Sequence, residues 1–218
     1  MEKKYKLTEE TINVIGRTLY RIEALKDFGD VKKGDKGGFI EKEDNLSQGG
    51  DCWVYNDAKV YDNAVIYDDA RVDDYAIVRN NAQVYGKAQI RGNAQVCNKA
   101  IIYGNAVIYE DAMVYGKANI YGNAQVYDNA MVYDDAKVFD NAQVHGIAEI
   151  FGKAKVYSNA EVFGNAKVYD FALVFDVAKV YGSAEVFGST TVYENAWVYG
   201  NAKIFGAAEV CGKAQICG

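Results

Sequence analysis

The chain contains one histidine, His145, in the sequence Val144-His145-Gly146. A histidine can serve as a general base when its ring lies within hydrogen-bond reach of the attacking group and a second residue orients it. No orienting partner is evident near His145 in the sequence, and no insertion nearby could supply an active-site loop. We therefore interpret His145 as a planar substitute in a series of aromatic residues and keep it as a weak catalytic candidate.

Three other residue classes could bind ions or phosphate groups. Aspartate pairs could offer oxygen ligands to Ca²⁺, but no supporting loop motif accompanies them, so solvated corners account for them better. These pairs are Asp68-Asp69, Asp73-Asp74 and Asp134-Asp135. No Cys-x-x-Cys pair suggests zinc, and the glycine-rich turns never form a Gly-x-Gly-x-x-Gly sequence or a P-loop. We predict neither a bound metal nor a cofactor.

All of these residues are embedded in a six-residue repeat. From Val54 to Ile216, all 28 positions at six-residue spacing are Val or Ile. Two residues earlier stands Ala at 26 of 28 positions, and one residue later stands Tyr or Phe at 21 of 28. Cysteine occupies the alanine position at Cys52 and the aromatic position at Cys97, Cys211 and Cys217. The cysteines are therefore variants of the repeat and do not indicate a disulfide framework.

The repeat predicts short strands joined by tight corners. Side chains alternate along a strand, so Ala and Val face one side while the intervening residue and the aromatic face the other. The next two residues are mostly Gly, Asn, Asp or Lys, and the first three of these best tolerate left-handed backbone at a corner. Successive coils then stack about 4.8 Å apart as a parallel solenoid. From the residues alone, the coil could have two sides or three.

A family resemblance decides between these coils. The run from Val84 to Gln89, Val-Tyr-Gly-Lys-Ala-Gln, resembles the hexapeptide repeat of the left-handed parallel β-helix. This resemblance implies a triangular prism with three hexapeptides per coil, or nine coils plus one strand, roughly 45 Å long at the spacing of paired strands. We predict an all-β fold in which residues 51–218 form the left-handed parallel β-helix.

Residues 1–50 are predicted to cap this helix. Thr11–Val14 and Thr18–Leu25 are rich in β-forming residues and flank Gly16-Arg17, a pattern typical of a hairpin. An uncovered first coil would expose its core and an unpaired strand edge. We expect the hairpin to cover that end.

The segment Val31–Ile40, with Asn45-Leu46-Ser47 and Cys52–Tyr55, resembles the entry segment of bacterial hexapeptide-repeat proteins of the YdcK-like transferase group. Many enzymes with the left-handed β-helix are acyltransferases. The resemblance implies that such enzymes work as trimers, with a histidine base and a loop or C-terminal helix that completes an acyl-donor site between subunits.

The outward positions suggest a binding surface. One column of aromatic positions, at 18-residue spacing, is unbroken from Tyr67 to Tyr193 and includes Tyr157 and Phe175. We expect its rings to stack, as a ladder that stabilises the fold or contributes to binding. The column passes the apolar stretch Phe171–Val177, in which four side chains should reach the surface: Phe171, Leu173, Phe175 and Val177. A cluster of this kind favours contact with a partner.

Charge and composition restrict the partners. The net charge is −6, which disfavours a nucleic-acid backbone along the rod. The sequence contains neither the apolar core of a signal peptide nor the run of about 18 apolar residues that a membrane span needs. We therefore expect a cytoplasmic, soluble protein without a membrane partner. The repeat continues to Ile216, and we expect two rods to pair tail to tail through Val210 and Ile216, or three chains to associate if the protein is an enzyme.

Two functions remain open from the sequence. The first is a non-enzymatic binding or scaffold protein that presents aromatic and acidic surfaces to a protein or a glycan. The alternative is an acyltransferase-like enzyme that uses His145. The uninterrupted repeat favours the first.

Overall fold

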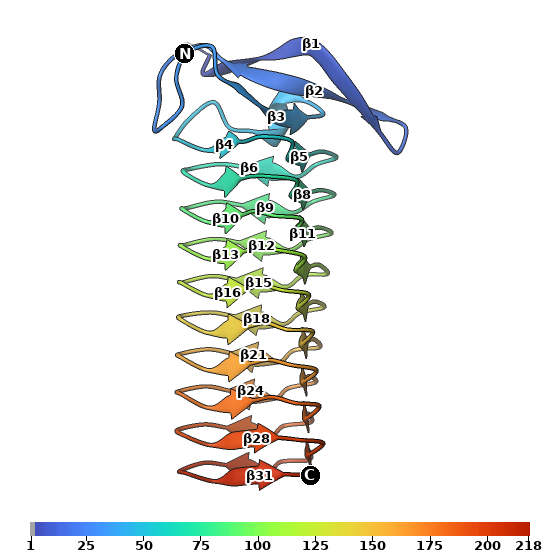
Figure 1. The fold of residues 1–218 in the computed structure, drawn as a ribbon, viewed down its shortest axis with the longest axis vertical. Coiled ribbons are helices and arrows are strands. Elements are labelled where there is room, and N and C mark those ends of the chain that lie inside the picture. The colour runs from blue at the N-terminus through green and yellow to red at the C-terminus, as the bar shows by residue number, and fades with distance from the viewer. Residues whose placement is uncertain (1–2) are drawn as a thin grey trace.

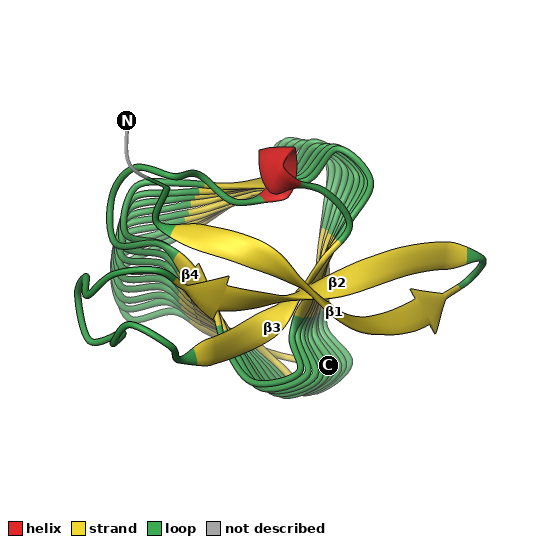
Figure 2. Ribbon diagram, turned by 90° about the horizontal axis from the view of Figure 1, so that it is seen from above, coloured by secondary structure: helices red, strands yellow, loops and turns green. Residues whose placement is uncertain are grey.

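A computed structural model describes residues 3–218. The chain forms a straight stack of coils with an N-terminal hairpin laid across one end (Figure 1). Seen along the stack, the coils superimpose in a three-sided outline (Figure 2). The predicted all-β parallel β-helix with three strands per coil and a hairpin cap is confirmed.

Each side of the stack is one sheet whose coil strands are parallel, and each coil strand pairs with the strand 18 residues away. Sheet 1 has the order β1-β2-β3-β5-β8-β11-β14-β17-β20-β23-β26-β29. Its coil strands are β5 (Lys59–Val60), β8 (Ile77–Val78), β11 (Gln95–Val96), β14 (Met113–Val114), β17 (Met131–Val132), β20 (Glu149–Ile150), β23 (Lys167–Val168), β26 (Glu185–Val186) and β29 (Lys203–Ile204).

Sheet 2 contains β4 (Trp53–Val54), β7 (Arg71–Val72), β10 (Gln89–Ile90), β13 (Val107–Ile108), β16 (Gln125–Val126), β19 (Gln143–Val144), β22 (Glu161–Val162), β25 (Lys179–Val180), β28 (Trp197–Tyr199) and β31 (Gln215–Cys217). Sheet 3 contains β6 (Val65–Ile66), β9 (Gln83–Val84), β12 (Ile101–Ile102), β15 (Asn119–Ile120), β18 (Lys137–Val138), β21 (Lys155–Val156), β24 (Leu173–Val174), β27 (Thr191–Val192) and β30 (Glu209–Val210).

The interior is filled by the two inward-facing residues of each repeat. The Ala and the Val or Ile of each strand are fully buried along most of the stack, from Ala58 and Val60 to Ala196 and Val198. Thr190 replaces one alanine without disturbing the coil, because its hydroxyl donates to the carbonyl of Phe187 at 2.7 Å. Neighbouring coils are therefore held by backbone hydrogen bonds outside a dry, tightly packed core.

The corners show why the repeat favours Gly, Asp and Asn. Each first corner residue, from Asn56 to Gly212 at six-residue spacing, has a positive φ between 49° and 76°. Non-glycine residues rarely adopt this conformation, and Asn and Asp tolerate it best. The acidic corner residues gain a second role, because their carboxylates accept the backbone N–H of the corresponding corner one coil later. Asp128 accepts from Gly146 at 2.8 Å, and Asp74 accepts from Gly92 at 3.0 Å.

The cap begins with the predicted hairpin, formed by β1 (Tyr5–Val14) and β2 (Arg17–Ala24). The turn is Ile15-Gly16, one residue earlier than expected, and Arg17 belongs to the second strand. The next strand, β3 (Lys36–Ile40), pairs with both β2 and the coil strand β5, so sheet 1 runs without a break into the cap. Figure 2 shows the hairpin reaching outward beyond the three-sided outline.

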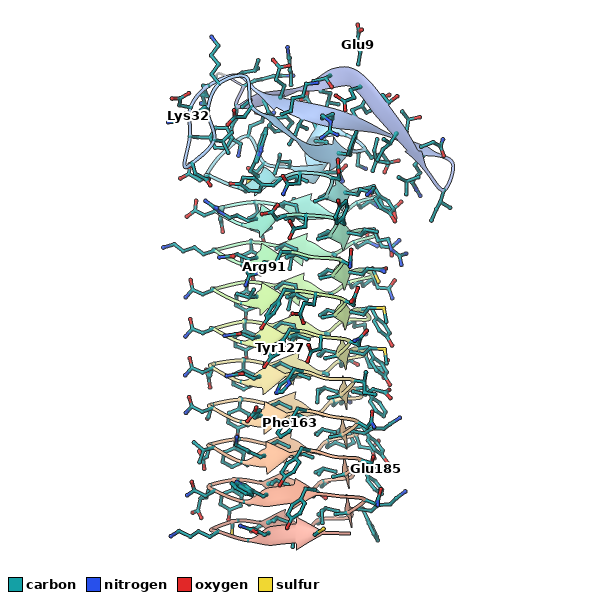
Figure 3. All side chains as sticks on the ribbon, in the orientation of Figure 1. Glu9, Lys32, Arg91, Tyr127, Phe163 and Glu185 are labelled. Atoms are coloured by element: carbon teal, nitrogen blue, oxygen red, sulfur yellow. The ribbon has the colours of Figure 1, made fainter. Side chains whose placement is uncertain are left out.

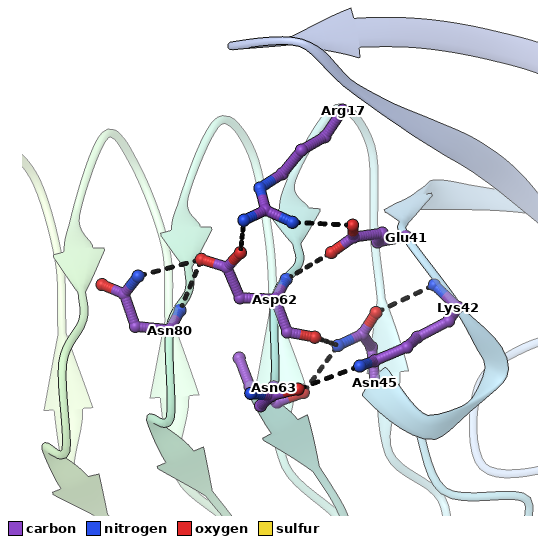
Figure 4. Close-up of polar contacts among 8 residues, drawn as sticks. Arg17, Glu41, Lys42, Asn45, Asp62, Asn63 and Asn80 are labelled. Carbon is purple, nitrogen blue, oxygen red and sulfur yellow. Dashed lines mark hydrogen bonds and ion pairs between the residues drawn. The ribbon is translucent and has the colours of Figure 1, made fainter.

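Side-chain hydrogen bonds fasten the cap to the first coils (Figure 4). Arg17 binds Glu41 at 2.9 Å and also pairs with Asp62. Asn45, in the short 3-10 helix Glu43–Asn45, is fully buried. Its amide donates to the carbonyls of Asp62 and Ala64, at 3.1 and 2.8 Å. These contacts give backbone groups of the first coil the partners that a further coil would otherwise supply.

Candidate functional site

The aromatic residue that follows each strand lies on the outside of the rod and stacks on its equivalent one coil away. Along sheet 3 the predicted unbroken column is confirmed: it runs through Tyr67, Tyr85, Tyr103, Tyr121, Phe139, Tyr157, Phe175 and Tyr193. Ring centroids in this column are 4.7 to 5.2 Å apart and the planes are parallel within 10°. Two shorter columns follow sheets 1 and 2.

This stacking determines which part of each ring a ligand can reach. A ring inside a column has a neighbour on both faces, so its edge and, in tyrosine, its hydroxyl remain for contact. The rings are only partly exposed, and burial raises the pKa of Tyr121 and of Tyr103 above the usual range. Inside the columns, the rings therefore present their edges rather than open faces.

His145 occupies one position of the column along sheet 2. Its ring lies 4.6 Å from that of Tyr127 and 5.1 Å from that of Phe163, with interplanar angles of 2° and 4°. Tyr127 and Phe163 follow one another down the flank in Figure 3, below Arg91 of the same series. The interpretation of His145 as a planar member of the aromatic series fits this geometry.

The structure supplies the orienting partners that the sequence did not reveal. Nε2 of His145 lies 3.0 Å from Oε1 of Glu161, and Nδ1 lies 3.7 Å from Oδ2 of Asp128. Neither partner is near His145 in the sequence, because the fold brings residues 16 and 17 positions away onto adjacent coils. Glu161 in turn accepts a hydrogen bond from Lys179 at 2.6 Å.

The contact of His145 with Glu161 repeats elsewhere in the stack. A ring at the aromatic position meets the outward residue 16 positions later: Tyr133 donates to Glu149 at 2.9 Å, and Tyr169 donates to Glu185 at 3.3 Å. Burial raises the pKa of the Glu161 carboxyl, but hydrogen bonds from Lys179 and His145 outweigh it and keep the pKa low. The contact between His145 and Glu161 is therefore one instance of an arrangement that the repeat produces along the stack.

The apolar cluster predicted around β24 forms one band across sheet 3. Phe171 and Val177 lie at the corners on either side of β24, with 58% and 43% of their surface exposed. Leu173 is half-buried between them, and the ring of Phe175 stacks between Tyr157 and Tyr193. We call Phe171, Leu173, Phe175 and Val177 the apolar band. The expected surface position of all four residues agrees with the structure.

Two of the hollows on the surface of residues 3–218 are lined by residues other than His145 and the apolar band. One is lined by Gly116, Lys117, Asp134, Asp135, Gly152 and Lys153. The other, beside the cap, is lined by Gly29, Asp51, Asp69, Arg71, Lys87 and Gln89. Within residues 3–218 no group of three or more His, Cys, Asp or Glu side chains is arranged to hold a metal ion. In the same residues no helix has the length and apolar character that a membrane span requires.

The remaining predicted residues lie in the final coil and along sheet 1. Val210 is buried and Ile216 is partly exposed. Pairing of two rods through these residues stays a prediction. The outward positions of sheet 1 also carry two ion pairs, Glu149 with Lys167 at 2.7 Å and Glu185 with Lys203 at 2.9 Å.

Sequence comparison identifies related proteins for part of the chain. Residues 124–136 match the family model described as the YdcK beta solenoid repeat. A segment of 69 residues is 36% identical to the uncharacterized acetyltransferase YdcK of Escherichia coli strain K12. This match covers 27% of the present chain and 20% of that relative, so it spans about a fifth of the relative's length. The repeat match, the partial relative and a β-solenoid of about ten turns together fit a YdcK-like repeat protein.

Proposed function

We propose that the protein is a non-enzymatic binding scaffold that presents the apolar band to a protein partner. The observation that carries the proposal is that neighbouring side chains already occupy both faces and one nitrogen of the His145 ring. Both ring faces are stacked, and Nε2 is 3.0 Å from Oε1 of Glu161. A general base needs a free nitrogen facing bound substrate. His145 would have to leave its stack to act as one.

A protein partner fits the surface better than a glycan. Sugar rings bind to proteins largely by lying on open aromatic faces, and in the sheet 3 column those faces are covered by neighbouring rings at about 4.8 Å. The apolar band instead offers exposed aliphatic and aromatic side chains on a backbone fixed by ladders on both sides. A rigid apolar cluster with partly exposed rings is typical of the anchor region of a protein interface.

Substitution at the corners tests this surface without disturbing the core. Phe171→Ser and Val177→Asn replace exposed residues by types that occupy the same corners in adjacent coils, Ser189 and Asn159. We expect the double variant to fold normally and to lose its protein partners in affinity purification from the native cell. Ile147→Asn is the matched control, because Ile147 is 52% exposed at a different corner. Equal recovery of the same partners by all three proteins would contradict the proposal.

The alternative function is acyl transfer, and one observation favours it: the partial relative is named an acetyltransferase. An enzyme of this kind should be trimeric and should bind acetyl-CoA in a cleft that includes His145. Thermal-shift titration with acetyl-CoA, combined with light scattering, separates the two functions. A concentration-dependent shift that His145→Gln abolishes, in a protein of trimeric mass, would establish the alternative and remove the scaffold proposal.

A further inference from the structure

A lysine is buried where the cap meets the first coil. Lys4 is only 1% exposed, immediately before β1. Its Nζ donates hydrogen bonds to the carbonyls of Cys52, Gly50 and Gly49, at 2.9, 3.2 and 3.4 Å. The same atom lies 4.9 Å from the centre of the Phe28 ring. Lysine is almost never buried to this extent without a specific set of partners, and here the partners are mostly backbone carbonyls of the first coil.

The one side chain that hydrogen-bonds to this amine is the thiol of Cys52. Lys4 Nζ lies 3.3 Å from Cys52 Sγ, and Cys52 is fully buried. Cys52 occupies the alanine position of its coil, which 26 of the 28 repeats fill with Ala. Alanine at this position is enough to complete the core, so packing of the repeat does not require the sulfur atom of Cys52. It is directed at the only nucleophilic nitrogen buried in the described cap.

The sulfur is close to an exposed segment of backbone. Cys52 Sγ lies 3.6 Å from the carbonyl oxygen of Ser47 and 3.7 Å from that of Gly49. Gly49 and Gly50 are exposed and carry no side chains. A local opening of this two-glycine segment would admit a molecule as small as hydrogen peroxide, without separation of the cap from the coil.

The pair has the chemistry for an oxidative cross-link. Burial lowers the pKa of Lys4 and so increases the fraction of neutral, nucleophilic amine. Burial raises the pKa of Cys52, and Lys4 opposes that effect. Because a buried thiol is a poor nucleophile by itself, its reaction depends on the adjacent amine as a proton acceptor. Lys4 can therefore serve first as base and then as nucleophile.

We propose that peroxide joins Lys4 to Cys52 through a sulfur–nitrogen bond. Lys4 takes the thiol proton as Sγ attacks one oxygen of hydrogen peroxide; the O–O bond breaks, and the same proton passes to the departing hydroxide. The products are a sulfenic acid and one water. Lys4 Nζ then attacks the sulfur, the S–O bond breaks, and a second water leaves with one proton from the amine. Peroxide is reduced, the sulfur is oxidised, and the protein loses two hydrogen atoms overall.

The cross-link would fasten the start of β1 to the first coil. The cap then could not separate from the solenoid without chain cleavage or reduction, and the loop of residues between positions 4 and 52 would stay closed in the unfolded chain. Closing a loop of this length stabilises a protein mainly through the unfolded state. The reaction makes the attachment of the cap dependent on the redox conditions.

Mass spectrometry tests the proposal directly. The full chain is prepared as a Cys97→Ala, Cys211→Ser, Cys217→Ser variant, treated with hydrogen peroxide, and alkylated at any remaining thiol. We expect a loss of about 2 Da, from the two hydrogens removed. We also expect a tryptic cross-link between the peptides that contain Lys4 and Cys52, and a melting temperature several degrees higher, reversed by dithiothreitol.

Two variants keep the test decisive. Cys52→Ala restores the common residue of the repeat, so it should fold normally and show no melting shift with peroxide. Lys4→Arg keeps the positive charge without an amine nucleophile, and should give sulfenic, sulfinic or sulfonic acid at Cys52 in place of the cross-link. The proposal is overturned if the parent protein gives only those acids, if Cys52 stays reduced, or if the Lys4→Arg protein shows the same reversible melting shift.

Discussion

The cap and the coils are stabilised in different ways. In the coils, a residue makes the same contact as its equivalent 18 residues away, as with Tyr133 on Phe151 and Phe151 on Tyr169. In the cap, single residues make several contacts that occur nowhere else in the described chain, as Asn45 does with Asp62 and Ala64. The coils therefore distribute stability over many equivalent positions, while the cap concentrates it in a few.

This difference has a physical origin in the backbone. A coil inside the stack finds hydrogen-bond partners in the coil on either side, so each chain segment needs only small side chains that fit the core. On its outer side the first coil has no complete coil as a neighbour, only cap segments such as β3, which pairs with β5. Polar side chains such as Asn45, Lys4 and Arg17 also reach across to it, and each can satisfy two or more backbone or charged groups. A single substitution should thus cost more in the cap than in the coils.

The largest effect is expected for Asn45→Ala. The substitution leaves the buried carbonyls of Asp62 and Ala64 and the N–H of Lys42 without their side-chain partner. At about 1 to 3 kcal/mol per unsatisfied buried group, with some relief by water, we expect a loss of about 3 kcal/mol in the free energy of unfolding. Urea denaturation followed by Trp53 fluorescence, in a Trp197→Phe background, measures this loss at the cap.

Thr190→Ala is the matched control in the coils. Thr190 is also fully buried, but its hydroxyl makes one bond to the carbonyl of Phe187, and 26 of the 28 repeats have alanine at this position. We expect a change below about 1 kcal/mol. A Thr190→Ala loss equal to that of Asn45→Ala would mean that coils and cap are equally sensitive to single contacts.

The second effect concerns the stacked rings. Phe151→Ala removes a half-buried ring that stacks on Tyr133 and Tyr169 at 4.9 and 4.7 Å. Each stacking contact contributes about 0.5 to 1.5 kcal/mol beyond burial, so we expect a loss of about 2 kcal/mol by urea denaturation. Phe205 is the control, because it stacks on Phe187 alone and is 62% exposed. The comparison fails if Phe205→Ala costs as much as Phe151→Ala.

The same contrast explains what could be predicted from the sequence. The parallel solenoid, the buried Ala and Val positions, the aromatic column and the surface position of Phe171 and Val177 all follow from a local pattern repeated many times, whereas the choice of three sides over two came from the family resemblance. The partners of His145 do not follow from that local pattern, because Glu161 and Asp128 lie about one turn of the solenoid away from it along the chain. The constant offset of 16 residues between a ring and its outward partner was present in the sequence and could have indicated Glu161.

The cap was predicted only in outline for a related reason. A hairpin has a recognisable local pattern, but the burial of Lys4 beside Cys52 depends on one side chain that crosses from the chain start to the first coil. A sequence rich in lysine at its beginning gives no sign of which lysine will be enclosed. Gly37 is another such case, because a Cβ there would lie 2.5 Å from the carbonyl oxygen of Val54. Non-repeating contacts of this kind become visible only in the folded chain.

A third prediction concerns a substitution in the cap that should stabilise the protein. Ile15, at the tip of the hairpin, has φ of +51° and is 89% exposed, so a branched side chain sits in left-handed backbone with no packing to offset the strain. Ile15→Asn places a residue that this turn prefers. We expect the free energy of unfolding to rise by about 1 kcal/mol. Ile15→Val, which keeps the branched carbon, should show no gain; a similar gain in both would indicate that exposure, not strain, is responsible.

The smallest effect is expected for the ion pairs on the coils, and it depends on pH. The hydrogen bond from Lys167 holds the pKa of Glu149 below its ordinary value of 4.5. A carboxyl with a lowered folded-state pKa stabilises the protein above the unfolded-state pKa, and that contribution is lost as the pH falls through the folded-state value. The pair is partly exposed, at 44% and 20% for the two side chains, so its contribution is at most about 0.5 to 1 kcal/mol.

Glu149→Gln should therefore lower the free energy of unfolding near pH 7 by no more than this amount, and the difference from the parent protein should shrink as the pH is lowered from 6 to about 3. Urea denaturation across that range measures it, and added salt should reduce the difference at neutral pH. Glu209→Gln is the control, because Glu209 makes no ion pair among residues 3–218. A pH-independent loss in Glu149→Gln would contradict the assignment to the ion pair, because glutamine loses the charge that binds Lys167 but keeps an oxygen that can accept the hydrogen bond from Tyr133.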